Sequence, residues 1–592
     1  MTKKNLLLSV ASILIVSATL TAYKYKEYQK KCETFNEMAD PAVDKSADWT
    51  LVANGLQASF VSIDKRFLKS ALPKIAIKAS DNVEGWKGEK VSAQLLLWTK
   101  GDVNEVEISF SDFTSKSGKL PASIAEARFE RYVMTDEFAS GCGKRNPKDF
   151  KASLSPDMLD NLTCFDITAK TARPVWVSVK IPQNAKYGMY TSKIEIRAKD
   201  EKPQYFELNL EVINQVLPKP SAWGFHLDQW QHPSAVARVE GVKVWSNAHF
   251  EAMKPVMKMA ADAGQKVITA TLNKDPWNVQ TFDPYADMII WTKNENGSWS
   301  YDYTVFDRWV KFMMDMGVDK MINCYSIIPW NNEIHYKDAV TGQFVNVKAS
   351  PKAQVFTDMW KPFLIDFSKH LKAKGWLKIT SIAMDERDQA SMDAAFKLIR
   401  SVAPELGVAF ADNKKTYKKY PDSRDVSVSV YQPFDQVDLT DRRNRGLNTT
   451  FYVCCSDTFP NQFTFSDPAE STYLAWYAKA AGFDGMLRWA FNSWVEKPME
   501  DSRFRTWPAG DTYIVYPGGR SSIRYERMLE GIQDFEKINI ISKKLKANGD
   551  METLAKLNDA VAKMKNVTRT PTWNDELNDA KRMLNKISRN TK

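Results

Sequence analysis

Residues 378–389 read KITSIAMDERDQ, and this stretch decides how the fold is interpreted. A short apolar run ends abruptly at two neighbouring carboxylates, Asp385 and Glu386. An apolar run of this length, bounded by polar residues, is typical of a buried parallel strand. A helical pattern over residues 391–402 follows, so the unit is strand, loop and helix. In such units catalytic groups gather just beyond the carboxyl end of the strand, which is where the two acids stand.

The same alternation of strand and helix recurs from residue 224 onward. Eight apolar runs predict strands at residues 224–229, 267–272, 321–328, 379–384, 408–411, 426–431, 451–455 and 486–491. Helical patterns separate several of them, although the helix between the fifth and sixth strands is poorly marked. Six strands are preceded by a glycine, a residue that often ends a helix in the left-handed conformation: Gly264, Gly317, Gly375, Gly407, Gly446 and Gly482. Eight such units predict a (β/α)8 TIM-type barrel.

The chain before the barrel alternates at period two. Phe206, Leu208 and Leu210 are separated by polar residues, which is typical of a half-buried strand. Similar runs without a convincing long helix predict an antiparallel β-sandwich, and two prolines in residues 217–222 mark its boundary. We therefore expect a sandwich over residues 45–217, the barrel over 218–535 and a C-terminal helical extension over 536–592.

The N-terminus carries an export pattern. Lys3 and Lys4 precede an apolar segment at residues 6–22 that ends in small residues, as in secretory signals. A basic run follows, which is unusual after a cleavage site. Residues 1–30 are therefore a signal peptide or an N-terminal membrane anchor, and we expect the protein in the periplasm, at the cell surface or in the medium.

Charge and composition exclude one class of partner. The net charge of +10 is spread over 82 basic and 72 acidic residues. No long basic block or RNA-binding signature occurs, so we expect no nucleic-acid partner. The sequence does not predict the oligomeric state.

Six cysteines are too few and too scattered for a disulfide scaffold or a zinc site, since no CxxC occurs. We expect no metal and no cofactor. In an oxidising compartment Cys142 and Cys164 are the predicted disulfide pair. Cys324, Cys454 and Cys455 lie in predicted strands and are expected to be buried thiols.

Counting along the barrel places Asp385 and Glu386 at the end of the fourth strand. Many retaining glycosidases of this fold pair a fourth-strand acid/base with a seventh-strand nucleophile. Here the seventh strand ends CCSD, so Asp457 is the one acid available there, and nothing marks it out.

Adjacent acids offer a second solution, in which the 2-acetamido group of the substrate is the nucleophile. One carboxylate then orients that group, while its neighbour protonates the leaving oxygen and later activates water. Neighbours on a strand point to opposite faces, so both can serve only if the backbone turns at residues 384–386.

Three stretches carry a family resemblance. They are HLDQWQHPSAVAR (residues 226–238), SIAMDE (residues 381–386) and a long run over residues 489–536, and they resemble glycoside hydrolase family 123. The likeness covers the sandwich, the barrel and the terminal helices. It implies a β-N-acetylgalactosaminidase that acts from the non-reducing end of glycans such as those on glycosphingolipids. By this resemblance Asp385 positions and stabilises the acetamido group, and Glu386 is the general acid/base.

Further residues at strand ends are candidates for binding the sugar, which needs an aromatic floor and directional hydrogen bonds. They are Asp228, Trp230, Tyr325, Asn413, Tyr431, Trp489, Asn492 and Trp494. Core packing explains each of these residues about as well. Glu333, beyond the third strand, is the reserve acid if Glu386 does not serve.

The leading interpretation is an exported, exo-acting glycosidase that removes terminal β-linked N-acetylgalactosamine with retention. One alternative is a β-N-acetylhexosaminidase for another 2-acetamido sugar. The other is a non-catalytic surface glycan-binding protein. Under each interpretation the protein is attached to the membrane if the N-terminal segment is retained. The Asp385–Glu386 pair argues against a binding protein, because adjacent carboxylates are costly to hold together.

Overall fold

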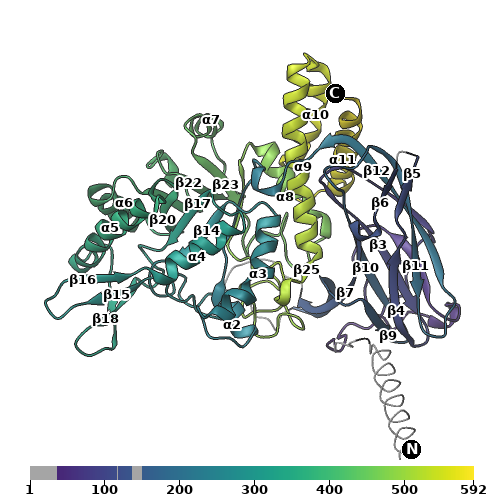
Figure 1. Cartoon of the computed structure of the whole chain (residues 1–592), viewed down its shortest axis with the longest axis horizontal. Helices are drawn as coiled ribbons and strands as arrows, with labels where there is room; N and C mark the ends of the chain where they lie inside the picture. Colours follow the sequence, from purple (N-terminus) through teal and green to yellow (C-terminus); the bar gives the residue numbers. More distant parts are fainter. Residues whose placement is uncertain (1–31, 33–36, 117, 137–149, 592) are drawn as a thin grey trace, which may run out of the picture.

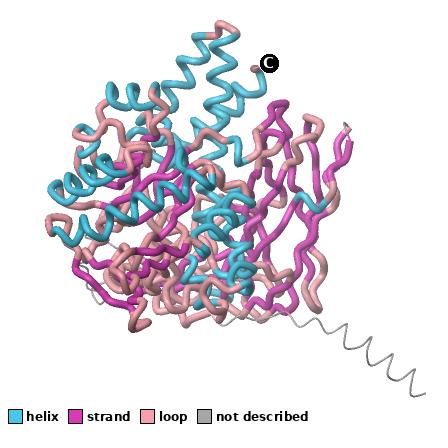
Figure 2. Tube along the Cα trace, turned by 60° about the vertical axis from the view of Figure 1, so that its left-hand side comes forward, coloured by secondary structure: helices cyan, strands magenta, loops and turns pink. Residues whose placement is uncertain are grey.

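The computed structural model describes residues 32, 37–116, 118–136 and 150–591. Figure 1 shows a sandwich of strands on one side and a helix-wrapped barrel on the other, with the C-terminal helices between them. Figure 2 separates the strand-rich half from the half in which helices surround strands. The predicted fold class is therefore confirmed. The predicted signal or anchor segment, residues 1–30, lies outside the described residues, and no helix in the described part is long and apolar enough to cross a membrane.

Two sheets form the sandwich. One has the order β1-β3-β10-β7-β8-β25 and the other β2-β12-β11-β4-β9, with β5 and β6 at its side. Their strands are β1 Gln57–Val61, β2 Ser80–Lys87, β3 Lys90–Thr99, β4 Val103–Phe110, β5 Phe113–Ser115, β6 Gly118–Leu120, β7 Ala125–Asp136, β8 Ala152–Leu159, β9 Cys164–Ile167, β10 Thr171–Lys180, β11 Gly188–Arg197, β12 Gln204–Val216 and β25 Ser521–Ser522.

The sandwich core follows from the period-two pattern. Phe206 and Leu208 of β12 pack in one apolar cluster with Phe60 and Val177 of the facing sheet. Pairing is antiparallel except between β2 and β12, which run parallel, a feature that side-chain alternation does not encode. β25 belongs to the barrel half of the chain, so one sheet continues across the boundary between the two units.

All eight predicted barrel strands are present in one parallel sheet with the order β13-β24-β23-β22-β21-β20-β17-β14. They are β13 His226–Gln229, β14 Val267–Thr271, β17 Met321–Tyr325, β20 Thr380–Asp385, β21 Gly407–Asp412, β22 Asp425–Ser429, β23 Asn448–Tyr452 and β24 Gly485–Arg488.

The barrel is nearly closed between β13 and β14. A single backbone bond joins these strands there, from Lys266 N to Leu227 O at 2.9 Å. Side-chain amides occupy the remaining positions: Gln265 accepts from the Gln229 amide at 3.0 Å, and Gln231 accepts from the Thr269 amide at 2.9 Å. Backbone groups that the sheet leaves unpaired are thus satisfied, as buried amides require.

The helices cover the outside of the barrel (Figure 1). They are α2 Pro233–Val239, α3 Asn247–Asp262, α4 Thr304–Asp315, α5 Gln354–Lys374, α6 Gln389–Val402, α7 Gln436–Asn444 and α8 Pro468–Ala481. Only a 3-10 turn, η6 Thr416–Lys418, follows β21, which explains the weak helical pattern between the fifth and sixth strands.

Two hairpins inserted after β14 and β17 were not predicted. Their strands β15 Ile290–Lys293, β16 Trp299–Asp302, β18 Glu333–Asp338 and β19 Phe344–Lys348 join into one four-stranded sheet. It lies beside the barrel, away from the sandwich (Figure 1).

Glycines end several helices as expected. Gly375 and Gly482 close α5 and α8 in the left-handed conformation, with φ of 75° and 86°. Gly264, Gly317 and Gly446 also have positive φ. Gly407 does not end a helix in this way; it is the first residue of β21.

The C-terminal helices are α9 Ile523–Ala547, α10 Met551–Ala562 and α11 Trp573–Asn590. Because α9 runs without a break across residue 536, the expected start of the helical extension falls inside a helix. The last helix is bound to the sandwich: Gln215 of β12 donates to the carbonyls of Ser588 and Thr591 at 3.0 and 2.6 Å.

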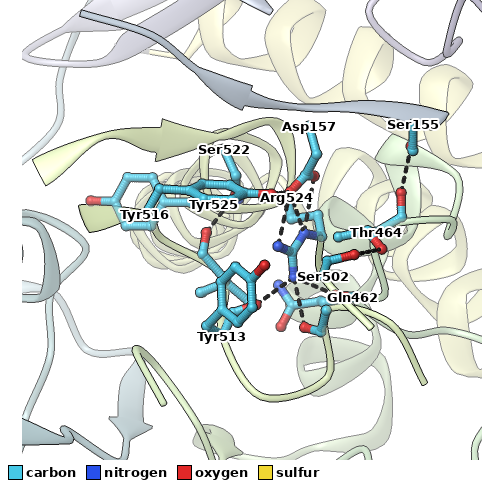
Figure 3. Close-up of polar contacts among 12 residues, drawn as sticks. Ser155, Asp157, Gln462, Thr464, Ser502, Tyr513, Tyr516, Ser522, Arg524 and Tyr525 are labelled. Atoms are coloured by element: carbon cyan, nitrogen blue, oxygen red, sulfur yellow. Dashed lines mark hydrogen bonds and ion pairs between the residues drawn. The ribbon is translucent and has the colours of Figure 1, made fainter. Parts of the chain in front are cut away.

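One buried arginine joins the two units. Arg524, at the start of α9, donates from Nε and Nη2 to the Asp157 carboxylate of β8 at 3.0 and 2.8 Å. Its Nη1 donates to the carbonyls of Gln462, Gly510 and Tyr513 at 3.0, 2.9 and 2.6 Å (Figure 3). Charge-assisted bonds of this kind are among the strongest hydrogen bonds in proteins. A single guanidinium therefore fixes a sandwich strand to the loops that follow β23 and β24.

Hydroxyl groups strengthen the same junction (Figure 3). Ser155 of β8 donates to the Thr464 carbonyl at 2.7 Å, and the Thr464 hydroxyl contacts Ser502 at 2.9 Å. The amide of Ser502 also donates to the Met134 carbonyl of β7 at 2.9 Å. The sandwich thus supports both loops directly.

The predicted disulfide is wrong, because Cys164 is bonded to Cys32. Cys142 lies outside the described residues. Cys455 is also disulfide-bonded and so is not the buried thiol expected. Cys324 is a buried thiol as predicted, and Cys454 is a partly exposed one. Spacing along the chain cannot identify the partner, since Cys32 is distant in sequence from Cys164 and adjacent to it only in the fold.

Removing the Cys32–Cys164 bond should destabilise the protein strongly. The bond joins residues 132 positions apart. Closing a loop of that length lowers the entropy of the unfolded chain, which raises the free energy of the unfolded state by about 5 kcal/mol at room temperature. We expect Cys32→Ser to lower the free energy of urea unfolding by up to that amount. Cys454→Ser, which removes a free thiol, is the control. Equal unfolding curves for Cys32→Ser and the parent would contradict this expectation.

Candidate active site

A cavity of about 300 Å³ opens where the barrel strands reach their carboxyl ends. Two carboxylates and several aromatic rings surround it, a combination that suits a sugar, with apolar faces and polar edges. The lining residues are Trp230, Gln280, Trp330, Asp385, Glu386, Ala411, Tyr452, Cys454, Cys455, Leu487, Trp489 and Trp507. Four of the ten residues predicted to be catalytic or to bind the sugar are among them: Asp385, Glu386, Trp230 and Trp489.

Strand alternation brings Asp385 to the cavity. Ile382 and Met384 face outward into the core between strands and helices, whereas Ala383 faces the barrel interior. Asp385 shares the face of Ala383 and is the last residue of β20. The chain bends at Glu386, whose amide donates to the Ala411 carbonyl at 3.0 Å. The turn that the sequence required is therefore present, and both acids line one cavity.

The remaining two residues of the DERD run fix what surrounds the pair. Arg387 donates to the Trp330 carbonyl at 3.0 Å and to Asn332 Oδ1 at 2.8 Å. Asp388 is the N-cap of α6 and accepts from the Ser391 amide at 3.1 Å. An N-cap carboxylate satisfies an otherwise unpaired helix amide, so the bend after Asp385 is anchored by the helix that follows it.

Asp385 is held by an indole. Trp330 Nε1 donates to Asp385 Oδ2 at 3.0 Å. Burial, and secondly the Glu386 carboxylate, raise the pKa of Asp385 to about 7, while the Trp330 bond opposes that shift. Asp385 is therefore poised to change its charge near neutral pH, as groups at functional sites often are.

Glu386 is held by a phenol. The Tyr452 hydroxyl donates to Glu386 Oε1, and Asn413 Nδ2 lies 3.4 Å from Oε2. Burial raises the pKa of Glu386, and the bond from Tyr452 works in the opposite direction. A carboxyl group with a raised pKa is suited to donate a proton.

Tyr452 was not identified from the sequence, although a signal was present. The side chains of Phe451 in β23 and of Val453 just after it belong to the outer core, whereas Tyr452 lies on the interior side. Period-two alternation applied to the seventh strand would therefore have pointed Tyr452 into the barrel. No such signal exists for Gln280 and Trp507, which are in long loops.

Three other predicted residues lie close to the cavity without lining it. Tyr325 is buried behind it, with its ring 4.7 Å from that of Trp230. Asp228 is buried inside the barrel, where burial and the Asp425 carboxylate raise its pKa. Asn413 reaches the rim through its contact with Glu386.

The other three predicted residues are placed differently. Tyr431 is half exposed and donates to the Phe459 carbonyl at 3.3 Å. Asn492 is buried and binds the backbone of His232 twice, at 2.9 and 3.0 Å. Trp494 is also buried and donates to the Val515 carbonyl at 2.7 Å. Asn492 and Trp494 thus brace the loop after β24 and do not line the cavity.

Neither alternative acid reaches the cavity lining. Asp457 is buried and accepts from the Cys454 amide at 2.7 Å. Glu333 is bound by Lys274 and Lys348 at 2.5 and 2.9 Å, which lower its pKa to about 2. Among the described residues, Asp385 and Glu386 are the only carboxylates that line the cavity. The described residues also contain no group of His, Cys, Asp or Glu arranged to hold a metal ion.

Solved structures that resemble this chain include a family 123 glycoside hydrolase. A family 123 glycoside hydrolase from Clostridium perfringens, studied for glycolipid glycan hydrolysis, superposes with a TM-score of 0.80 at 28% identity, over 90% of this chain and 97% of that one. Two other glycoside hydrolases are too distant to carry an argument. One is a family 39 enzyme from Bacteroides cellulosilyticus WH2, with a TM-score of 0.32 at 8% identity over 64% of this chain and 76% of that one. The other is a Bacteroides ovatus GH5 xyloglucanase, with a TM-score of 0.27 at 9% identity over 76% of this chain and 98% of that one. No curated protein matches the chain.

Two family descriptions match in sequence. The glycoside hydrolase 123 N-terminal domain matches residues 60–198, within the sandwich. The glycoside hydrolase 123 catalytic domain matches residues 230–541, which include seven of the eight barrel strands and both cavity carboxylates. Together with the close structural likeness, these matches show that the chain belongs to glycoside hydrolase family 123.

Proposed function

We propose that the protein is an exported exo-acting enzyme that removes terminal β-linked N-acetylgalactosamine from glycans, with the substrate's acetamido group as nucleophile. The observation that carries the proposal is the shared cavity of Asp385 and Glu386. A retaining glycosidase with its own nucleophile needs a second carboxylate across the scissile bond. Asp385 and Glu386 are consecutive residues at the end of β20, and among the described residues no third carboxylate lines the cavity to face them. We therefore assign the nucleophile to the substrate.

The two carboxylates have different roles in the proposed reaction. The acetamido oxygen attacks C1, the bond from C1 to the leaving oxygen breaks, and Glu386 gives that oxygen its proton. Ionised Asp385 orients the acetamido N–H and stabilises the positive charge of the oxazolinium ion. Water then attacks C1, Glu386 takes its proton, and the ring opens. Two inversions return the β configuration.

Cavity size and composition support an exo-acting sugar site. About 300 Å³ lies at the lower end of small-molecule sites, which fits one sugar ring inside and the leaving group at the rim. Trp230, Trp330 and Trp489 provide aromatic surface around the two acids. The work on the Clostridium perfringens relative concerned glycolipid glycans, and this supports a glycan as the substrate class.

Export is supported by the cysteines. Cys32 and Cys164 are bonded to each other, and Cys455 is also disulfide-bonded. Disulfides form and persist in oxidising compartments and are rare in the cytosol. This agrees with the basic and apolar pattern at residues 1–30.

A panel of chromogenic β-glycosides tests the proposed activity. We expect the highest kcat/KM for the N-acetylgalactosaminide and negligible turnover of the galactoside, which lacks the acetamido group. A higher kcat/KM for the N-acetylglucosaminide would establish the other specificity on the same two residues. Binding without hydrolysis of any member would support the non-catalytic alternative.

Tyr452→Phe should move the pH profile in a defined direction. The Tyr452 hydroxyl stabilises the ionised form of Glu386, so its removal raises the pKa of that carboxyl further. Glu386 acts as an acid when protonated, and activity is lost as the pH rises through its pKa. The alkaline limb of kcat/KM should therefore shift to higher pH. Tyr187→Phe, on an exposed ring of the sandwich, is the control. An unchanged limb, or a shift to lower pH, would contradict the role of Tyr452.

A further inference from the structure

Two residues of the cavity wall come from long loops. Most lining residues are at, or just beyond, the ends of barrel strands, and these form the floor beside Asp385 and Glu386. Gln280 belongs to the loop between β14 and β15, and Trp507 to the loop between β24 and β25. Both are partly exposed. Because their loops extend beyond the strand ends that carry Asp385 and Glu386, Gln280 and Trp507 form the rim of the cavity.

The two loops are fastened to each other at this rim. Arg505 Nη1 donates to the Val279 carbonyl at 2.9 Å, so the residue next to Gln280 is tied to the loop that carries Trp507. The Arg505 guanidinium lies 4.8 Å from the ring centre of Phe504. Phe504 in turn lies edge-on to Phe282 of the other loop, with the ring centres 6.5 Å apart. We call this set of contacts the rim clasp.

The backbone beside Gln280 is held in an uncommon conformation. Val279 has a φ of +63°, a region that β-branched residues rarely adopt. Its amide donates to Asp275 Oδ2 at 2.7 Å and its carbonyl accepts from Arg505. Further along the loop, Arg238 donates to both oxygens of Asp283 at 2.8 Å. Such conformations persist only where the surroundings enforce them, and they concentrate at ligand sites.

Gln280 and Trp507 have complementary chemistry. A primary amide has two N–H donors and a carbonyl acceptor, which together can bind neighbouring hydroxyl groups. An indole presents a broad apolar face with a polar edge. One hydroxyl-binding amide and one apolar platform at the rim are what a hexose beyond the scissile bond requires. In the proposed reaction the terminal sugar occupies the floor beside Asp385 and Glu386.

We infer that Gln280 and Trp507, held by the rim clasp, bind the sugar of the leaving group. They thereby determine which sugar the enzyme prefers as the one linked to the terminal 2-acetamido sugar. This inference rests on the proposed function, because it needs a terminal sugar at Asp385 and Glu386. The ligand class is a hexose linked through its oxygen to the terminal 2-acetamido sugar. Binding energy from this remote sugar raises kcat/KM for a glycan but cannot act on a substrate without it.

The test compares two substrates that share the terminal sugar. One is the β-linked disaccharide of N-acetylgalactosamine and galactose, and the other is the β-fluoride of N-acetylgalactosamine, whose leaving group is too small to touch the rim. Gln280→Ala and Trp507→Ala should each lower kcat/KM for the disaccharide by about tenfold or more, as expected for a lost hydrogen bond or stacked ring. Their kcat/KM for the fluoride should stay within about twofold of the parent, which also shows that the variants are folded. Arg505→Ala should lower kcat/KM for the disaccharide and spare the fluoride in the same way.

Gln343→Ala is the matched control, because Gln343 is exposed in the turn between β18 and β19. We expect it to behave as the parent on both substrates. Equal losses on both substrates, or an unchanged disaccharide rate, in the Gln280 and Trp507 variants would overturn the subsite alone. A parent protein that hydrolyses neither substrate would overturn the proposed function, and the subsite with it.

Discussion

Glu386→Gln should lose most of its activity on a natural glycan, by roughly a hundredfold to ten-thousandfold in kcat. The sugar oxygen that leaves is a poor leaving group and needs the proton that Glu386 supplies. The amide of the variant has no acidic proton, but it keeps the shape of the side chain and an oxygen to accept from Tyr452. An activated aryl glycoside, whose phenolate leaves unaided, should lose much less in its first step.

Glu333→Gln provides the control for this result, since Glu333 is the other acid suspected from the sequence. Its two lysine partners keep it ionised, so the variant should turn over glycan like the parent. Rates for both variants on the same glycan settle the assignment. Unchanged glycan turnover by Glu386→Gln, or a large loss of turnover in Glu333→Gln, would show that Glu386 is not the general acid.

Replacing the 2-acetamido group of the substrate by hydroxyl should nearly abolish turnover, and Asp385→Asn should impair it severely. Both changes act on the same step, because the acetamido oxygen forms the new bond and ionised Asp385 stabilises the cation that results. A thiazoline analogue of the intermediate should inhibit the parent strongly and Asp385→Asn weakly, since mimics of high-energy species bind more tightly than substrate. Initial-rate kinetics and inhibition constants measure these effects.

The stereochemistry of the first product gives an independent check on this mechanism. NMR of the fresh hydrolysate should show the β anomer. A covalent sugar trapped on Asp385, Glu386 or Asp457 by a 2-fluoro substrate would refute substrate assistance. Equal turnover of the 2-hydroxy substrate would refute it as well.

The sequence was sufficient for those parts of the molecule that repeat or that follow local rules. The eight strands were recognisable because each buried run has a strand's length and lies between polar residues or glycine. Asp385 and Glu386 were recognisable because they end such a run, and strand ends of a parallel barrel converge on one face. Even the bend at Glu386 was predictable from the sequence, because neighbouring residues on a regular strand point to opposite faces and both acids could not otherwise reach one cavity.

Contacts between distant segments could not be predicted in this way. Trp330 meets Asp385, and Tyr452 meets Glu386, only because β17, β20 and β23 close into one barrel. Cys32 reaches Cys164 through the sandwich, and neither residue's neighbours in sequence reveal the other. Asn492 and Trp494 follow the eighth strand as a site residue would, but backbone groups take up their polar atoms. The local sequence pattern identifies which residues reach the carboxyl-terminal face of the barrel. Tertiary packing then decides which of their side chains line the cavity and can contact a substrate.

The buried pair of Arg524 and Asp157 has a consequence for how such a protein can be divided or recombined. A barrel fragment cut from the sandwich would lose Asp157, the counter-charge of Arg524; in the whole chain, removing one partner of such a buried ion pair costs of the order of 3–5 kcal/mol of stability. It would also leave β25 without the strand it pairs with and free the loops after β23 and β24. The barrel is therefore not an independent module, and a chimera between relatives must exchange the sandwich strands β7 and β8 together with those two loops.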